Sequence, residues 1–183
     1  VFARLQAGEI LLVDVRELPA RWRLVGEVAI GVLAGVLFPA ADPAWPGAAL
    51  TALMVVGLVN AVNLVDGLDG LAAGVVAAGA LGFAAIGGAA RSPGLAVGGA
   101  LVGFLAFNRP PARIYLGDSG AYLLGTALAV LAALVLEDPG GVAVWAAVPL
   151  AVAVPVADTA VAILRRAIAH RPLLEGDRSH IYD

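Results

Sequence analysis

Long apolar runs separated by short breaks rich in proline, glycine and aspartate dominate this sequence. A helix that crosses the hydrocarbon core of a bilayer needs roughly 20 mainly apolar residues, with a range of about 17 to 25. Six runs are candidates, of which the fourth is short and the last is long. We therefore predict an all-α fold, a polytopic transmembrane bundle with about six spanning helices, at residues 24–40, 47–65, 71–89, 94–108, 119–136 and 141–168.

The composition supports a membrane location. Hydrophobic residues make up 61% of the chain and charged residues 14%, and the mean hydropathy is +0.95, whereas a soluble domain carries about 25% charged residues. The chain has no cysteine, which excludes disulfides and thiolate metal sites. The net charge of -3 does not indicate a protein that binds nucleic acid. We therefore expect the lipid bilayer to be a partner and nucleic acid not to be one.

The arginines predict how the bundle is oriented. If the loops alternate between the two sides of the membrane, only Arg91 of the 11 basic residues falls on one side. Cytoplasmic loops carry an excess of basic residues, so the other side should face the cytoplasm. That topology brings the polar segments to the cytoplasmic side, namely Asp14, the Asn60–Asp69 cluster, Asp118 and the Arg178–His180 tail.

The first polar island covers residues 60–70 and lies between two apolar runs. Asn60, Asn63 and Asp66 follow one another at intervals of three residues, so they share one face of a helix. Asp66-Gly67 then breaks the helix, and Asp69 lies in the turn before the next one. Hard oxygen ligands beside an open loop suit Mg²⁺, and backbone N–H groups at a helix start can hold an anion. The island therefore predicts a metal-dependent phosphate site.

The second polar island, Gly117-Asp118-Ser119-Gly120, begins another apolar run. Helix caps and turns alone would also explain aspartate and asparagine at such places. Two carboxylate-bearing loops on one side of a membrane bundle favour a functional site, because ionisable groups at membrane depth are costly. Two further features stay open. Asp158-Thr159 is either a wall of the site or a contact between helices, and His180 either contacts a phosphate or is solvated.

Taken together, these residues resemble the polyprenyl-phosphate N-acetylhexosamine-1-phosphate transferase family. The resemblance covers nearly the whole chain, but only the central and C-terminal part of the family's roughly ten-helix bundle. We therefore expect residues 1–183 to be one integral-membrane transferase domain, as a fragment without the family's first helices. The matching motifs are Asn60-x-x-Asn63-x-x-Asp66-Gly-Leu-Asp69-Gly-Leu, Pro111-Ala-Arg-Ile-Tyr-Leu-Gly117-Asp118-Ser119-Gly120, and Asp158-Thr159 through Arg165-Arg166 to Asp177-Arg178-Ser179-His180.

The resemblance implies a reaction at the cytoplasmic face of the bacterial inner membrane. A polyprenyl phosphate, undecaprenyl phosphate in bacteria, attacks the β-phosphate of a UDP-N-acetylhexosamine. The products are polyprenyl-diphospho-sugar, used for cell-envelope polysaccharides, and UMP. The cofactor is Mg²⁺, with Mn²⁺ as an alternative ion, and a homodimer is an open hypothesis.

The resemblance also implies roles for particular residues. Asp118 and Asn63 would hold the metal, and Asp66 would line the metal and phosphate site. Asp14, Asp66 and Asp118 are the expected catalytic residues. The expected substrate-binding residues are Asn60, then Gly67, Leu68 and Asp69 for the uridine, and Arg178 and His180 for the diphosphate or the sugar.

Two departures from the family pattern leave alternatives open. The tail His180-Ile-Tyr-Asp183 has one histidine and is nearer to the GlcNAc type than to the phospho-MurNAc-pentapeptide type, so both donors remain candidates. The family carries an Asp-Asp pair where this chain has Val13-Asp14, and an inactive family remnant is therefore a second hypothesis. A transporter module is a third, because intramembrane carboxylates and broken helices also mark ion pathways.

Overall fold

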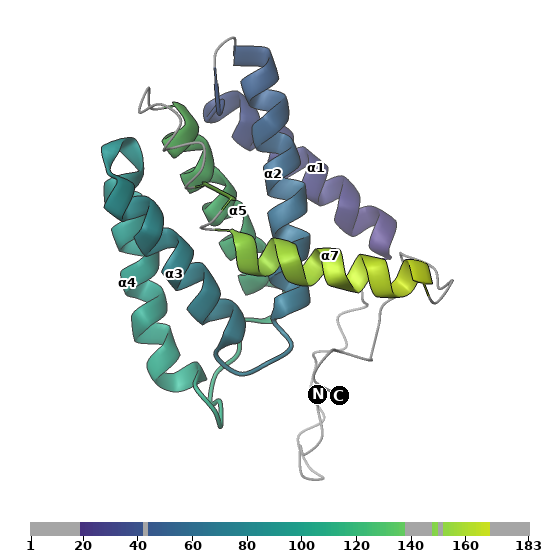
Figure 1. The fold of residues 1–183 in the computed structure, drawn as a ribbon, viewed down its shortest axis with the longest axis vertical. Helices are drawn as coiled ribbons and strands as arrows, with labels where there is room; N and C mark the ends of the chain where they lie inside the picture. Colours follow the sequence, from purple (N-terminus) through teal and green to yellow (C-terminus); the bar gives the residue numbers. More distant parts are fainter. Residues whose placement is uncertain (1–18, 42–43, 138–147, 150–151, 169–183) are drawn as a thin grey trace.

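The computed structural model describes residues 19–41, 44–137, 148–149 and 152–168 (Figure 1). All regular structure within these residues is helical, which confirms the all-α class. The first five helices match the first five apolar runs, with ends within four residues of those expected. The elements are α1 (Ala20–Leu37), α2 (Ala44–Val65), α3 (Leu71–Ile86), the 3₁₀ turn η1 (Gly88–Ala90), α4 (Arg91–Asn108), α5 (Gly117–Glu137) and α7 (Ala153–Ile168).

Three of the described helical segments are long and apolar enough to cross a membrane by length and composition. They are Ala44–Val65, Gly88–Asn108 and Gly117–Glu137, with mean hydropathies of 2.1, 1.3 and 2.0. The helix α3 is also apolar but shorter. The helix α1 carries Arg21, Arg23 and Glu27 in its first half. These helices fit a polytopic membrane bundle.

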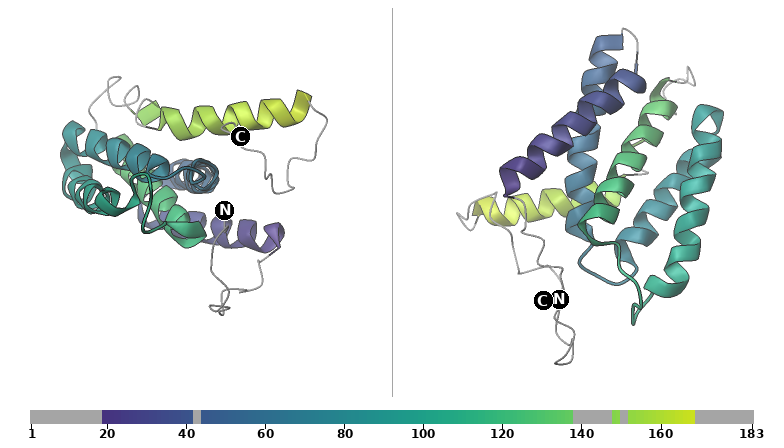
Figure 2. Two further views of the ribbon diagram at one scale, coloured as in Figure 1. Left: turned by 90° about the horizontal axis from the view of Figure 1, so that it is seen from below. Right: turned by 180° about the vertical axis from the view of Figure 1, so that it is seen from behind.

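The last apolar run differs from the single long helix expected over 141–168. The helix α7 begins at Ala153 and has 16 residues, while residues 141–147 lie outside the described part of the chain. Pro155 lies in the first turn of α7, where proline is tolerated because its missing N–H has no partner there. Figures 1 and 2 show α7 running across the other helices rather than along them.

The helix α2 is central to the packing. It contacts α1, α5 and α7, while α3 packs against α4 and α5. A Cβ added to Gly125 of α5 would lie 2.5 Å from the Cα atom of Val59 in α2, so only glycine permits this approach. Small residues allow such contacts between apolar helices. The largest completely buried side chains include Phe83, Leu128, Leu131, Val55 and Val59.

The alternating direction of the helices places their connections. The end of α2, the start of α3, the end of α4 and the start of α5 lie together at one end of the bundle (Figure 1). The loops with Asp66, Asp69 and Asp118 therefore share that end, as the arginine pattern predicts.

Candidate active site

Asp118 connects three helices. It lies in the first turn of α5, where a negative charge interacts favourably with the helix dipole. Asn63 of α2 donates a hydrogen bond from Nδ2 to Asp118 Oδ1 over 3.3 Å. Arg23 of α1 lies on the other side, with Nη1 3.7 Å from Asp118 Oδ2. The side chain of Asp118 is 69% exposed, so it also remains accessible to a ligand.

Asp66 supplies a second carboxylate at this place. It directly follows α2 and is partly buried, and its N–H donates to Val62 O over 3.1 Å. Burial, with the negative charge of Asp118 as a second cause, raises the pKa of the Asp66 carboxyl to about 6. The negative charge of Asp118 disfavours ionisation of the Asp66 carboxyl, and a cation bound between the two groups would offset that effect.

The oxygen donors around Asp118 fit a hard divalent cation. Asn63 uses its amide nitrogen toward Asp118, which leaves its Oδ1 available as a ligand atom in addition to the carboxylates of Asp66 and Asp118. Among the described residues, no group of three or more His, Cys, Asp and Glu side chains could hold a metal. A site with two carboxylates and one amide oxygen suits Mg²⁺, which usually keeps several waters or substrate phosphates as its other ligands.

The loops that carry Asp66 and Asp118 are tied together by Asn108, a side chain at the end of α4 that is only 5% exposed. Its Oδ1 accepts a hydrogen bond from Gly70 N over 3.0 Å, and its Nδ2 donates to Ile114 O over 2.8 Å. Asp69 Oδ2 accepts a third bond between the loops, from Ala112 N over 2.9 Å. These bonds fix the two loops relative to each other.

The replacement Asn108→Leu should therefore loosen both loops. It leaves Gly70 N–H and the Ile114 carbonyl without their partner, which costs about 1–3 kcal/mol. We expect a fall of that size in the free energy of unfolding, measured by denaturant titration in detergent. Tyr115→Phe is the matched control, because Tyr115 only makes an exposed 3.2 Å bond to Ala112 O in the same loop. Equal stability of the two variants would contradict this role for Asn108.

Asn60 is bonded to Glu27, a residue that the sequence did not predict as part of the site. Its Nδ2 donates to Glu27 Oε2 of α1 over 2.6 Å and to Val56 O over 2.9 Å. Glu27 is only 6% exposed. The signal was present, since Glu27 is the one ionisable residue in the run 24–40 and ionisable residues within membrane spans are usually functional. Arg23 and Asn108 were also missed as members of the site.

The remaining expected site residues are placed only in part. Gly67 and Leu68 lie in the turn between α2 and α3, where Leu68 O accepts a hydrogen bond from Leu71 N over 3.1 Å. Asp14, Arg178 and His180 lie outside the described residues. Their predicted roles stay predictions.

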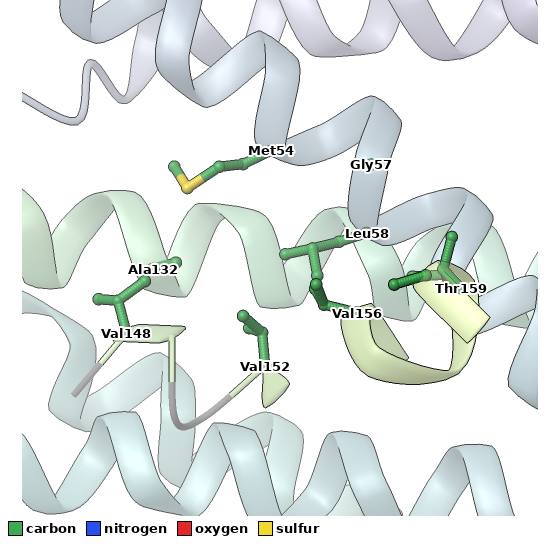
Figure 3. A pocket seen from close by; sticks show the side chains of 10 residues that line it. Met54, Gly57, Leu58, Ala132, Val148, Val152, Val156 and Thr159 are labelled. Carbon is green, nitrogen blue, oxygen red and sulfur yellow. The ribbon is translucent and has the colours of Figure 1, made fainter. Parts of the chain in front are cut away.

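Two cavities adjoin α2. A groove of about 420 Å³ lies between α1, α2 and α5, with Arg23, Glu27 and Ser119 among its lining residues and mainly apolar side chains elsewhere. A second cavity of about 360 Å³ lies between α2, α5 and α7, and its lining is apolar except for Thr159 (Figure 3). The Thr159 hydroxyl donates to Pro155 O in its own helix over 2.8 Å. Thr159 thus lines an apolar cavity, and its hydroxyl bonds within α7 and not to a residue of the Asp118 site.

A sequence profile of glycosyl transferase family 4 matches residues 11–136, more than half of the chain. The chain belongs to glycosyl transferase family 4. The matched region contains every residue that meets around Asp118, Asn60 and Asn108 in the structure. The family assignment thus covers the whole described candidate site.

Several relatives within family 4 have names that state a reaction. The chain is 39% identical over 148 residues to the probable undecaprenyl-phosphate N-acetylglucosaminyl 1-phosphate transferase of Bacillus subtilis (strain 168), covering 75% of this chain and 40% of that protein. It is 36% identical over 151 residues to the phospho-N-acetylmuramoyl-pentapeptide-transferase of Moorella thermoacetica, covering 68% and 48%. It is 40% identical over 90 residues to the enzyme of that name from Heliobacterium modesticaldum, covering 46% and 28%. The chain spans less than half the length of these relatives.

Proposed function

We propose that the protein containing this chain transfers N-acetylhexosamine-1-phosphate, specifically GlcNAc-1-phosphate, from a UDP-sugar to undecaprenyl phosphate. The products are undecaprenyl-diphospho-GlcNAc and UMP, and the reaction is Mg²⁺-dependent. The protein is a multi-pass protein of the bacterial inner membrane with a cytoplasmic site, and it serves cell-envelope polysaccharide synthesis. The observation that carries the proposal is the meeting of Asn63, Asp66 and Arg23 around Asp118.

These residues have the chemistry that phosphoryl transfer requires. Catalysis of such reactions is mostly positioning and neutralisation of negative charge. Asp118, Asp66 and Asn63 would hold Mg²⁺, which neutralises the diphosphate of the nucleotide sugar when bound. Arg23 adds a fixed positive charge on the α1 side of Asp118. The bonds from Asn108 and Asp69 keep the two carboxylate-bearing loops in register, so that substrate binding need not order them.

The groove between α1, α2 and α5 suits an amphiphilic acceptor. Arg23 and Ser119 line it next to Asp118, while Ile30, Val55 and Leu123 line it further along. A phosphate at the Arg23 end and an isoprenoid chain along the apolar part would match this distribution. The name of the Bacillus subtilis relative includes undecaprenyl phosphate, which supports the same acceptor.

The deciding experiment measures UMP release from UDP-GlcNAc by membranes that contain the full-length protein. We expect release that requires undecaprenyl phosphate and Mg²⁺ and stops with EDTA. Mn²⁺ should replace Mg²⁺ at least in part, because both ions accept carboxylate and water ligands. Release that persists without lipid or in EDTA contradicts the proposal.

A second candidate donor, UDP-MurNAc-pentapeptide, is favoured by the names of two of the relatives. The same assay with that donor separates the two substrates. Val13, where the family has an aspartate, lies outside the described residues. If neither donor is used, Val13→Asp in the same assay tests the hypothesis of an inactive remnant, because restored release would identify that position as the cause.

A further inference from the structure

Glu27 is a buried carboxylate that the fold of α1 does not require. The residue is 6% exposed, and its neighbours in the sequence, Gly26 and Val28, are apolar. Burial of a charge is costly even with a good partner, and an apolar residue of similar size is often as stable or more stable. The contact between α1 and α2 has other supports, since a Cβ at Gly35 or Gly31 would already lie within 3 Å of the α2 backbone. A role in the site explains Glu27 better than a role in packing.

Glu27 and the Val56 carbonyl together fix which way the Asn60 amide points. Asn60 Nδ2 donates to Glu27 Oε2 and to Val56 O, and a backbone carbonyl can only accept hydrogen bonds. Both hydrogens of the amide are therefore used, and Oδ1 is the atom left for a ligand. Asn63, one turn further along α2, has the same arrangement, because its Nδ2 donates to the Asp118 carboxylate.

Glu27 also lies next to Arg23. The two are four residues apart on α1, so they are neighbours on one face of the helix. Arg23 in turn lies 3.7 Å from Asp118 Oδ2. Glu27 and Arg23 both line the groove between α1, α2 and α5, which Ser119 lines as well. Glu27 thus bonds to Asn60 on α2 and lies one helical turn from Arg23, the partner of Asp118.

We propose that Glu27 is a positioning residue of this site. It holds the Asn60 amide so that Oδ1 accepts a hydrogen bond from an N–H or O–H group of the UDP-sugar. This inference rests on the function proposed above. In this proposal Glu27 acts through Asn60 and takes no part in the transfer of the phosphate itself.

A double-mutant cycle in the full-length protein tests the orientation of the amide. Asn60→Asp turns the 2.6 Å contact into two facing carboxylates, and we expect kcat/KM to fall about 10- to 100-fold. Glu27→Gln can still accept from Asn60, so its loss should be several-fold smaller. In the double variant, the glutamine amide introduced at position 27 can donate to the carboxylate introduced at position 60, and at least about tenfold of the loss should return. The loss should appear in KM and in the calorimetric Kd for UDP-GlcNAc.

Thr51→Val is the matched control for a structural effect. The Thr51 hydroxyl lies 2.8 Å from Phe38 O and links α1 to α2 at the far end of the bundle. Its loss should lower the melting temperature and leave KM and Kd unchanged. The inference is overturned if the double variant is as impaired as Asn60→Asp, or if the Glu27 and Asn60 variants change only stability. Absence of UDP-sugar turnover and binding in the unsubstituted protein overturns the proposed function and this inference with it.

Discussion

Asp118→Asn should lower Mg²⁺-dependent UMP release about 100- to 1000-fold, the size of effect seen when one electrostatic contact to a transition state is removed. Asparagine has nearly the same shape and can still accept the 3.3 Å bond from Asn63 Nδ2. It loses the negative charge that faces Arg23 and that would hold the cation. The variant should therefore fold normally and fail in catalysis.

Two measurements distinguish loss of activity through the missing negative charge from loss of activity through unfolding of the variant. The melting temperature in detergent should change little, because Asp118 is exposed and its pair with Arg23 is a surface pair of small value. The Mg²⁺ concentration for half-maximal rate should rise steeply, because a neutral amide binds the ion more weakly than a carboxylate. Glu137→Gln at the other end of α5 is the matched control and should retain full activity. UMP release at the unsubstituted level by Asp118→Asn would exclude Asp118 as a metal ligand.

The helices were predictable because lipid imposes a simple constraint on sequence. A spanning helix must satisfy its backbone internally and be apolar over its length, so composition alone locates it. Each of the first five apolar runs corresponds to one helix of the structure, and three of the described helical segments are long and apolar enough to span a membrane. The last run does not, since a helix of its full length would have to accommodate prolines at 149 and 155. Proline removes a backbone donor and interrupts helices, which hydropathy does not register.

The site was predictable at the level of loops and not at the level of contacts. Arginine placement brings the Asp66 and Asp118 loops to one side, and the structure confirms that they meet there. The distance in sequence between Asn63 and Asp118 is 55 residues, so only the packing of α2 on α5 decides that these two side chains touch. The sequence did not predict Glu27 as a site residue for a related reason. The role of a single carboxylate in an apolar run becomes clear only when its partner on another helix is known, here Asn60 on α2.

Asp69 shows how a motif residue can serve the fold as well as the ligand. The family resemblance assigns it to the uridine, and the structure shows its Oδ2 holding the backbone of Ala112. The adjacent Gly70 has a φ of 79°, a left-handed conformation that glycine adopts without strain. The Asp-Gly pair therefore builds the turn that lets Asp69 reach the next loop. Sequence motifs do not distinguish these two uses.

The close packing of α2 on α5 makes Gly125→Ala the second variant with a large expected effect. The new Cβ would lie 2.5 Å from Val59 Cα, 2.7 Å from Val59 N and 2.8 Å from Leu58 O. All three are backbone atoms, so no side-chain rotation relieves the clash and the helices must separate. Overpacking of this kind costs about 1–3 kcal/mol, and we expect the free energy of unfolding to fall by that amount.

Activity should fall further than stability in Gly125→Ala. Gly125 lies two turns from Asp118 on α5, and Val59 lies one turn from Asn63 on α2, so separation at the clash moves the two site residues apart. A displacement of about 1 Å in a catalytic site can cost about 100-fold in rate. We expect a loss of that order in UMP release per folded molecule, with folded protein measured by size-exclusion chromatography in detergent.

Two controls make the result specific to the α2–α5 contact. Gly82→Ala on α3 adds the same methyl group where nothing lies within 4 Å, so its activity should equal that of the unsubstituted protein. Its stability should be equal or higher by up to about 1 kcal/mol, because alanine is favoured over glycine inside a helix. Val59→Ala should not rescue Gly125→Ala, because the clash involves the Val59 backbone and not its side chain. Rescue by Val59→Ala, or full activity of Gly125→Ala alone, would show that the approach of α2 to α5 does not set the distance between Asn63 and Asp118.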